Sequence, residues 1–399
     1  MPKPSPNLAK IPPYLFTALN IKAEEARKKG VDVINLGIGD PDLGTPPMIV
    51  KALQDAVADP VTHNYPGTKG TPDFRKAASE WMKTRFGVTV DADKEVLNLI
   101  GSKEGLAHLI FAYVQPGDVV LCPSPGYPVY ENFTILCGGT PYIVPMLPEN
   151  NFLPDYTKIP ADILAKAKIL FLNYPNNPTG AIAPDKFIRE TIELCRKHDI
   201  LLCHDNAYSE MTFDGYRAPS FLQVDGAKDV CIEMFSLSKM YNMTGWRCGF
   251  AVGNEEALKA LFVVKTNCDT GTFKPIQKAG ALALSKSDEI LAGLNDIYAK
   301  RRDIMVKGLQ KLGWDYKGGA ATFYLWVPVP TGWTSVDFVT LLLEKCGIVV
   351  PPGVGYGPAG EGFFRMALTV PEKRLHDVLE RMEKNNVTWN ALAKGKKTA

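Results

Sequence analysis

The chain lacks the features that would place it in a membrane or a nucleic-acid complex. Its formal net charge is only +2 at pH 7, which gives no extended positive field for a polyanion. No uninterrupted apolar run approaches the length of a membrane span. The first twenty residues contain prolines and lysines but no apolar signal-peptide core. We therefore expect a cytoplasmic protein without nucleic-acid or membrane partners.

The cysteines and histidines of the chain do not form any of the usual metal-binding patterns. The eight cysteines occur singly, without a C-x-x-C pair, and several lie in apolar runs, so we expect reduced, buried thiols. The five histidines include no H-E-x-x-H or other paired spacing. His204 and Asp205 could together bind a metal, but no other feature supports one. The sequence predicts no metal.

What the chain does have is a repeating order of apolar runs that predicts an α/β fold. A length of 399 residues is enough for two hydrophobic cores. Short, continuously apolar runs alternate with helical patterns such as Gly105–Val114 and Pro184–Lys197, which is typical of a mostly parallel sheet covered on both faces. The expected strands are Val96–Ile100, Val119–Cys122, Ile169–Asn173, Ile200–His204, Val230–Phe235 and Cys248–Val252.

The C-terminal part predicts a second, smaller α+β unit. A long helical pattern over Ile290–Leu312 precedes short strand-like runs, and a last helix is expected over Glu372–Lys384. The expected strands there are Phe323–Val327, Ile348–Val350 and Phe363–Leu368. We predict an N-terminal arm with part of the small domain over residues 1–45, a large domain over 46–285 and a small domain over 286–399.

Ligand sites in parallel α/β sheets form at the carboxyl ends of the strands, so the residues after each run are the candidates. Lys239 follows an apolar run, where partial desolvation would free its amine as a Schiff-base nucleophile. Ser236, Ser238 and Arg247 have the offsets to bind a dianionic phosphate beside it. Taken alone, this pattern also fits a lysine that simply faces water.

Three further strand ends carry polar or aromatic candidates. Ser102 opens a helix after the first run and either binds phosphate with the helix N-terminus or serves as an ordinary N-cap. A loop framed by prolines presents Tyr127 as a stacking surface. Asn177 could donate its amide to a ligand oxygen, or it could belong to a plain Asn-Pro turn.

Two charged residues in apolar strands need partners. Asp205 ends a buried strand, where a carboxylate is costly unless balanced, and a protonated pyridinium nitrogen would balance it. Tyr208 could reach the phenolic oxygen of the same ring. Arg365 needs a carboxylate, either from the protein or from a substrate. With Lys239, these residues supply the parts of a pyridoxal phosphate (PLP) site.

Six segments together carry a resemblance to a known family. They are Asn35–Asp42, Tyr65 before Gly67, Asn177–Gly180, Asp205 with Tyr208, Ser236–Lys239 with Arg247, and Arg365. With them the chain resembles the class I/II aminotransferases of PLP fold type I over essentially its whole length. The resemblance implies a large domain with a mostly parallel sheet flanked by helices, and a smaller α+β domain. It also implies a homodimer with shared active sites that transfers an amino group from an L-amino acid to a 2-oxo acid, with 2-oxoglutarate as the expected acceptor.

The same resemblance implies a role for each candidate. The catalytic residues would be Lys239, which forms the Schiff base and moves a proton, Asp205 at the ring nitrogen, and Tyr208 at the phenolic oxygen. The cofactor would contact Ser102, Lys103, Tyr127, Asn177, Asp205, Tyr208, Ser236, Ser238, Lys239 and Arg247, with Tyr65 and Asn267 reaching the neighbouring subunit's cofactor. The substrate would contact Tyr14, Gly39, Lys103, Tyr127, Asn177 and Arg365, whose guanidinium would bind the α-carboxylate.

Within the family, the chain is most similar to the LL-diaminopimelate aminotransferases of lysine biosynthesis. The shared stretches are Tyr14–Phe16, Gly101–Gly105, Tyr174–Gly180, Tyr241–Arg247 and Ala321–Trp326. Met240 stands where those enzymes usually carry Thr, and Thr68 lies in a segment without the acidic residue that some of them place there. The alternatives are an aspartate or alanine aminotransferase and, in another class, a PLP-dependent lyase or a PLP-sensing regulatory module.

Overall fold

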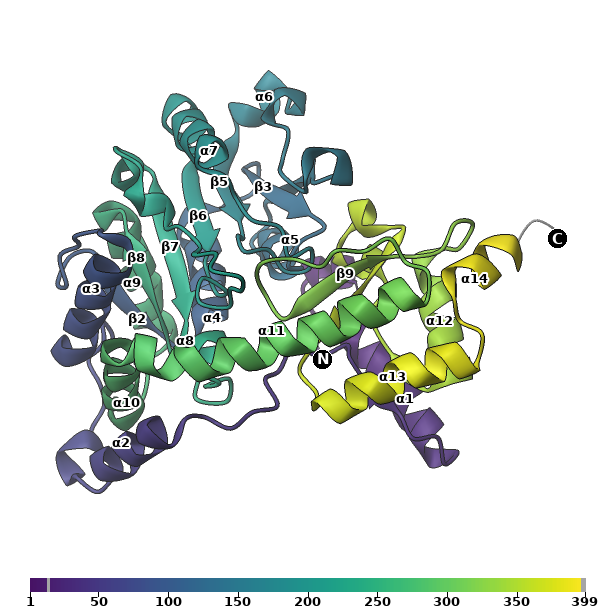
Figure 1. Ribbon diagram of the computed structural model, residues 1–399. Coiled ribbons are helices and arrows are strands. Elements are labelled where there is room, and N and C mark those ends of the chain that lie inside the picture. Colours follow the sequence, from purple (N-terminus) through teal and green to yellow (C-terminus); the bar gives the residue numbers. More distant parts are fainter. Residues whose placement is uncertain (13–14, 396–399) are drawn as a thin grey trace.

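Residues 1–12 and 15–395 are described by the computed structural model (Figure 1). A large sheet forms the centre of one part, and a smaller α+β part lies beside it. The 25-residue helix α11 (Ser287–Lys311) runs from the large part across to the small one. This is the α/β architecture that the order of apolar runs predicts.

The central sheet has seven strands over the described residues, in the order β2-β8-β7-β6-β5-β3-β4. Its strands are β2 Val96–Leu99, β3 Val119–Ser124, β4 Thr140–Pro145, β5 Ala167–Leu172, β6 Leu201–Asp205, β7 Cys231–Ser236 and β8 Gly249–Gly253. Only β8 runs antiparallel to its neighbours, so the other six strands point the same way. The six expected strands are confirmed. The edge strand β4 was not expected, because its two prolines and mostly unburied side chains hide the strand pattern.

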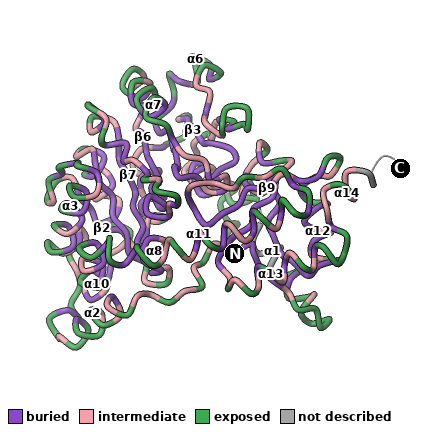
Figure 2. Tube along the Cα trace, in the orientation of Figure 1, coloured by how far each residue is buried: buried purple, intermediate pink, exposed green. Residues whose placement is uncertain are grey.

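Helices cover both faces of this sheet, which is why its central strands are apolar without alternation. Helices α4 (Ser102–Tyr113), α5 (Val129–Leu136) and α9 (Glu255–Cys268) pack on one face around Leu106, Tyr130 and Leu261. Helices α2 (Pro47–Val57), α3 (Pro72–Phe86), α7 (Asp185–His198) and α10 (Lys274–Ser285) pack on the other face, where Trp81 and Ile188 lie. The central strands are buried and the outer faces of the helices are exposed (Figure 2). No described helix has the length and apolar character of a membrane span.

The helices that complete the described fold are 4 to 15 residues long. Their bounds are α1 Leu15–Lys28, α2 Pro47–Val57, α3 Pro72–Phe86, α4 Ser102–Tyr113, α5 Val129–Leu136, α6 Ala161–Leu164, α7 Asp185–His198, α8 Leu237–Met240, α9 Glu255–Cys268, α10 Lys274–Ser285, α12 Ser335–Cys346, α13 Glu372–Lys384 and α14 Trp389–Gly395. The last expected helix is confirmed at both of its ends.

The smaller part is built on two short strand pairs. Strand β9 (Tyr324–Pro328) is antiparallel to β11 (Phe363–Ala367). Strand β10 (Ile348–Val349) is parallel to β1 (Ile34–Asn35), so residues near the N-terminus join a C-terminal unit. A separate hydrophobic core, which includes Tyr298, packs these strands against α11, α12 and α13.

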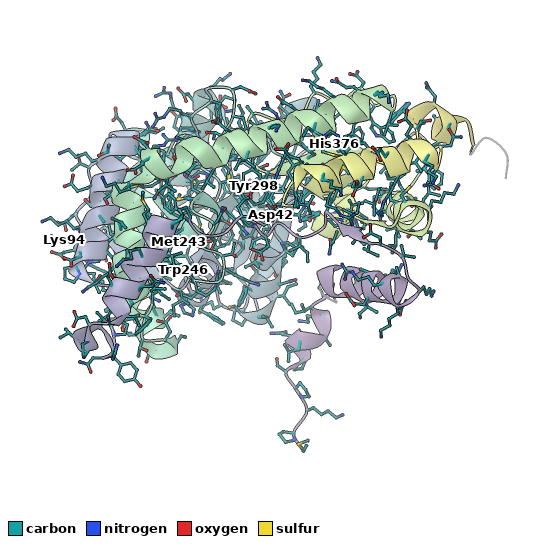
Figure 3. The ribbon with its side chains drawn as sticks, turned by 60° about the horizontal axis from the view of Figure 1, so that its bottom comes forward. Asp42, Lys94, Met243, Trp246, Tyr298 and His376 are labelled. Carbon is teal, nitrogen blue, oxygen red and sulfur yellow. The ribbon has the colours of Figure 1, made fainter. Side chains whose placement is uncertain are left out.

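The segment between β1 and α2 is fixed to α11 by a bidentate ion pair. Arg301 is 3% exposed and donates to both carboxylate oxygens of Asp42, at 2.6 and 2.9 Å. It also donates to the backbone oxygen of Leu368 at 3.0 Å. Figure 3 shows Asp42 beside Tyr298, under α11. This pair holds the preceding residues of the segment at the junction of the two parts, where a cavity opens.

Candidate active site

Because six strands of the sheet run in one direction, their carboxyl ends meet at one edge, and a cavity of about 440 Å³ opens there. Most of the predicted site residues line it. The lining consists of Ile38, Gly39, Ser102, Lys103, Tyr127, Asn173, Asn177, Asp205, Ala207, Tyr208, Ser236, Ser238, Lys239, Thr244, Arg247, Tyr324, Tyr356 and Arg365. Residues from both parts of the molecule thus share one cavity.

Lys239 lies on the helical turn α8, one turn beyond the strand end where the sequence placed it. Its Nζ donates to the backbone oxygen of Gly39 at 2.6 Å. Burial lowers the pKa of Lys239 to about 8; Asp40 opposes this shift, while Arg365 and Arg247 add to it. At pH 7 about a tenth of amines with this pKa are neutral, against roughly one in three thousand for an ordinary lysine. The site therefore favours a nucleophilic amine.

Asp205 ends β6 and is held by a residue that the sequence analysis missed. Tyr130 donates its hydroxyl to Asp205 Oδ2 at 2.9 Å, and its ring stacks on Phe171 with centroids 4.6 Å apart. The other oxygen, Oδ1, is buried and has no hydrogen-bond partner in the protein. Burial raises the pKa of Asp205 to about 6, although Tyr130 and His204 oppose the shift. A buried, unpartnered carboxylate oxygen at the cavity fits the protonated ring nitrogen of PLP.

His204 does not share a site with Asp205, although the two are adjacent on β6. Its Nδ1 lies 2.6 Å from Glu233 Oε1, and its Nε2 lies 2.9 Å from the backbone oxygen of Tyr174. The side chains of His204 and Glu233 are both fully buried, and the imidazole stacks on Phe221. Since successive side chains of a strand point to opposite faces, His204 is engaged away from the cavity. Its contact with Tyr174 anchors the loop that carries Asn177.

Asn177 and Tyr208 approach the middle of the cavity from different elements. The backbone N–H of Asn177 donates to Asn173 Oδ1 at 2.7 Å, and Asn173 in turn donates to the backbone oxygen of Asp205 at 2.6 Å. Tyr208 Oη lies 3.1 Å from Tyr324 Oη. Burial raises the pKa of Tyr208 well above its ordinary value, so its hydroxyl stays protonated and can donate.

A group that we call the phosphate seat lies at the start of α4. It consists of Gly101, Ser102, Ser236, Ser238 and Arg247. Gly101 has φ +76°, and a Cβ added there would lie 2.3 Å from Arg247 Nη2, so the guanidinium packs directly on the backbone. Ser238 Oγ is buried without a hydrogen-bond partner, while Ser236 Oγ accepts the Ser238 N–H at 3.3 Å. A helix N-terminus, hydroxyls and a guanidinium together fit the phosphate of PLP.

The turn that leads into Arg247 packs on the large part's core. Met243 and Trp246 lie next to one another in Figure 3, and both contribute to the core below the sheet. Arg247 itself has φ +53° and donates through Nη1 to the backbone oxygen of Thr244 at 2.9 Å. The packed turn therefore fixes the direction in which the guanidinium leaves the backbone.

Arg365 enters the cavity from β11 of the smaller part. It is 2% exposed and donates to Asn177 Oδ1 at 2.8 Å and to the backbone oxygen of Gly37 at 2.6 Å. Its guanidinium carbon lies 4.1 Å from the ring centroid of Tyr324 and 5.0 Å from that of Tyr356. These contacts fix the plane of the guanidinium, which suits bidentate recognition of a carboxylate.

Three predicted residues do not line this cavity as described. Tyr65 is 85% exposed, and Asn267 is exposed on α9 with its Nδ2 donating to the backbone oxygen of Val263 at 2.8 Å. Their predicted contact with a neighbouring subunit stays a prediction. Tyr14 lies outside the described residues. Met240 is fully buried in the core, so its departure from the family pattern concerns packing rather than the cavity wall.

Tyr130, Asn173, Tyr324 and Tyr356 contribute to the site but were not among the predicted residues. Tyr130 lies three residues after Tyr127 at the start of a helix, so helical spacing could have suggested it. The two tyrosines of the smaller part follow no strand of the large sheet, and only the folded arrangement brings them to the cavity.

Comparisons with known proteins agree with this geometry. A family model described as "Aminotransferase class I and II" matches residues 31–382. The chain belongs to this family. It is therefore a PLP-dependent transaminase with the PLP fold type I architecture.

Several relatives and solved structures cover nearly the whole chain. LL-diaminopimelate aminotransferase 2 from Nostoc sp. (strain PCC 7120) is 54% identical over 96% of this chain and 98% of the relative. The LL-diaminopimelate aminotransferase of Gloeobacter violaceus is 52% identical over the same shares. Among solved structures, substrate-bound BacF from Bacillus subtilis has a TM-score of 0.93 at 36% identity, covering 98% of this chain and 99% of that one. Aspartate aminotransferase from Thermus thermophilus with maleate has a TM-score of 0.89 at 30% identity, covering 96% and 100%.

Proposed function

We propose that this transaminase is an LL-diaminopimelate aminotransferase of lysine biosynthesis that uses 2-oxoglutarate as amino acceptor. The observation that carries the proposal is identity of 49 to 54% over at least 94% of the chain with five relatives of that name. Structural neighbours at 30 to 38% identity include an aspartate aminotransferase and a probable N-succinyldiaminopimelate aminotransferase, so the higher sequence identity to the relatives above is the more specific support.

The charges of the cavity suit substrates with two carboxylates. Among the described residues, four basic side chains line it, those of Lys103, Lys239, Arg247 and Arg365, whereas Asp205 is the one carboxylate. If Arg247 binds the cofactor phosphate and Arg365 the substrate's α-carboxylate, Lys103 is placed to meet the second carboxylate. Both LL-diaminopimelate and 2-oxoglutarate carry two such groups.

Each part of the cavity has a role in holding PLP. When bound, PLP supplies an electron-accepting ring that stabilises negative charge at the substrate's α-carbon. Asp205 Oδ1 would keep the ring nitrogen protonated, while Tyr130 holds that carboxylate in place. Tyr208 and Asn177 would bind the phenolic oxygen, and Tyr127 would contact the ring. The phosphate would be bound by the phosphate seat.

Lys239 then moves the proton. Its Nζ removes the proton from the substrate's α-carbon, a task that suits an amine with a pKa of about 8 near neutral pH. The backbone oxygen of Gly39 holds the amine at the cavity wall between proton transfers. Arg365 fixes the substrate by its α-carboxylate, so that the α-carbon stays within reach of this amine.

We further propose a cytoplasmic homodimer whose sites are completed across the interface. Tyr65 and Asn267 support this, because both are exposed and neither lines the cavity of its own chain. In the dimer they would reach the neighbouring subunit's cofactor, and Tyr14 would contact substrate. Sedimentation of the purified protein tests the dimer.

The substrate assignment is tested with the purified protein and a panel of amino donors. LL-Diaminopimelate should convert the yellow cofactor to its colourless amine form, and added 2-oxoglutarate should then yield glutamate. If LL-diaminopimelate leaves the colour unchanged while aspartate or alanine removes it, the substrate assignment is wrong. Release of pyruvate and ammonia from a cysteine-type donor without any 2-oxo acid would instead indicate a lyase.

A further inference from the structure

A partly buried ion cluster of Lys265, Glu104, His108 and Asp269 lies behind the first turn of α4, and none of these residues lines the cavity. Lys265 of α9 is fully buried, and its ammonium lies 3.2 Å from Glu104 Oε2 and 2.9 Å from Asp269 Oδ1. The Nδ1 of His108 lies 2.6 Å from Glu104 Oε1. A buried ammonium is costly unless its charge is matched, so these four side chains depend on one another for their positions.

Glu104 connects the cluster directly to the phosphate seat. Its Oε2 accepts the backbone N–H of Ile100 at 2.8 Å, and its own N–H donates to the backbone oxygen of Gly101 at 3.2 Å. These two hydrogen bonds therefore fix the backbone of residues 100–104 relative to the Glu104 side chain. Because Gly101 and Ser102 belong to this turn, the Glu104 carboxylate determines where the N-terminus of α4 points.

The cluster is anchored on its far side as well. Asp269 Oδ1 accepts the N–H of Gly271 at 2.7 Å, which fixes the loop after α9. Thr272 in that loop donates its hydroxyl to the backbone oxygen of Leu99 at 3.2 Å, at the end of β2. The turn that begins α4 is thus held from behind by Lys265 and from its strand side by Thr272.

Charge balance matters here because the seat receives a dianion. A carboxylate in the first turn of α4 would by itself repel a phosphate bound at the same helix end. Burial raises the pKa of Glu104, but His108, Lys265 and the Ile100 N–H together hold it below its ordinary value, so it stays ionised. Lys265 supplies the charge that offsets it.

The same side chains could be considered for a metal. Ligand atoms of Glu104, His108 and Asp269 lie within 4.8 Å of one another. The ammonium of Lys265, however, already contacts both carboxylates. We assign the cation role in this cluster to Lys265.

We propose that Glu104 and Lys265 are positioning residues for the cofactor phosphate: they fix the first turn of α4 and balance its charge, so that its N–H groups and the Ser102 hydroxyl meet the phosphate. The inference rests on the proposed binding of that phosphate at the seat. It predicts that disturbing the cluster weakens the recognition of the phosphate and leaves the recognition of the ring largely intact.

The test compares two ligands that differ only by the phosphate. Full-length protein freed of cofactor is titrated with PLP and with pyridoxal. Glu104→Ala should raise the Kd for PLP by about tenfold and change that for pyridoxal by less than about twofold. Glu104→Gln keeps an oxygen for the Ile100 N–H and should stay within about threefold of the unaltered protein for PLP. Glu256→Ala is the matched control. The Glu256 side chain lies on α9 and is 77% exposed, so this variant should change neither the Kd for PLP nor that for pyridoxal.

Lys265→Met provides a second variant if Glu104→Ala fails to fold. It leaves the carboxylates near the seat uncompensated, so PLP binding should weaken by at least about tenfold and pyridoxal binding by much less. Three outcomes overturn the inference: the affinities for PLP and pyridoxal fall equally, the affinity for PLP is unchanged, or neither variant folds. In each case the cluster would contribute only to folding, or would have no role in binding the phosphate. If the unaltered protein binds PLP no more tightly than pyridoxal, the phosphate assignment itself is wrong.

Discussion

The two sides of the cavity are built in different ways. The side that we propose for the cofactor comes from strand ends of the large sheet and from the helices that begin next to them. Its key groups are held by backbone contacts and a partly buried ion cluster. The substrate side is assembled from segments far apart in the chain, namely Ile38 and Gly39, Tyr324, Tyr356 and Arg365. The topology of the sheet fixes the cofactor side, whereas packing between the two parts of the molecule fixes the substrate side. We therefore expect changes on the two sides to separate cofactor binding from substrate binding.

The largest effect is expected at the junction of the two sides. Lys239→Ala removes the amine that we propose takes the substrate's proton, and turnover should fall by at least about a thousandfold. PLP should still bind through the phosphate seat. Turnover is measured as glutamate formation, and PLP binding by equilibrium dialysis. Lys259→Ala, on the surface of α9, is the control, and near-unaltered turnover by Lys239→Ala would contradict the proposed mechanism.

A second change separates substrate recognition from chemistry. Arg365→Lys keeps the charge but loses the planar pair of donors, so KM for 2-oxoglutarate should rise by about tenfold to a hundredfold. The Kd for PLP should stay within about twofold, because Arg365 belongs to the smaller part. Steady-state kinetics and a PLP titration measure the two quantities. An equal loss of PLP affinity would remove the distinction between the two sides.

A third change probes the backbone of the substrate side. A Cβ at Gly39 would lie 1.8 Å from Tyr324 Oη, so Gly39→Ala must displace the tyrosine or the backbone that holds Lys239. We expect kcat/KM to fall by about tenfold. Gly44→Ala is the matched control, because a Cβ there meets nothing within 4 Å. Similar kinetics for the two variants would show that the Gly39 contact does not matter.

The last prediction, with an effect of about the same size, concerns pH. Capture of PLP by the cofactor-free protein requires a neutral Lys239 amine, whose pKa is lowered to about 8. The capture rate should therefore rise by about tenfold between pH 7 and pH 9 and level off above. Stopped-flow absorbance measures it. A midpoint near the ordinary lysine value, above pH 10, would show that burial does not depress the pKa of this amine.

The sequence predicted the cofactor side better than the substrate side, for a physical reason. Lys239, Asp205 and Asn177 each follow an apolar run, and parallel strands bring their carboxyl ends together whatever the details of packing. Glu104 was missed because the hydrogen bond between its carboxylate and a backbone N–H leaves no trace in apolar periodicity. The approach of Tyr324 to Gly39 depends on how two units pack, and local sequence does not encode that.

The reversed direction of β8 has a further consequence. In an all-parallel sheet, one strand ends at one edge of the sheet and the next strand begins at the opposite edge. A long crossover must therefore connect them. Because β8 runs antiparallel to β7, it begins at the same edge of the sheet where β7 ends, and the 12 residues between Ser236 and Gly249 join the two strands along the cavity edge. The amine, two hydroxyls and the guanidinium of the site thus belong to one unbroken stretch, Ser236–Arg247. These groups can therefore be inherited or lost together. An insertion between Lys239 and Arg247 would separate the amine from the guanidinium of the phosphate seat.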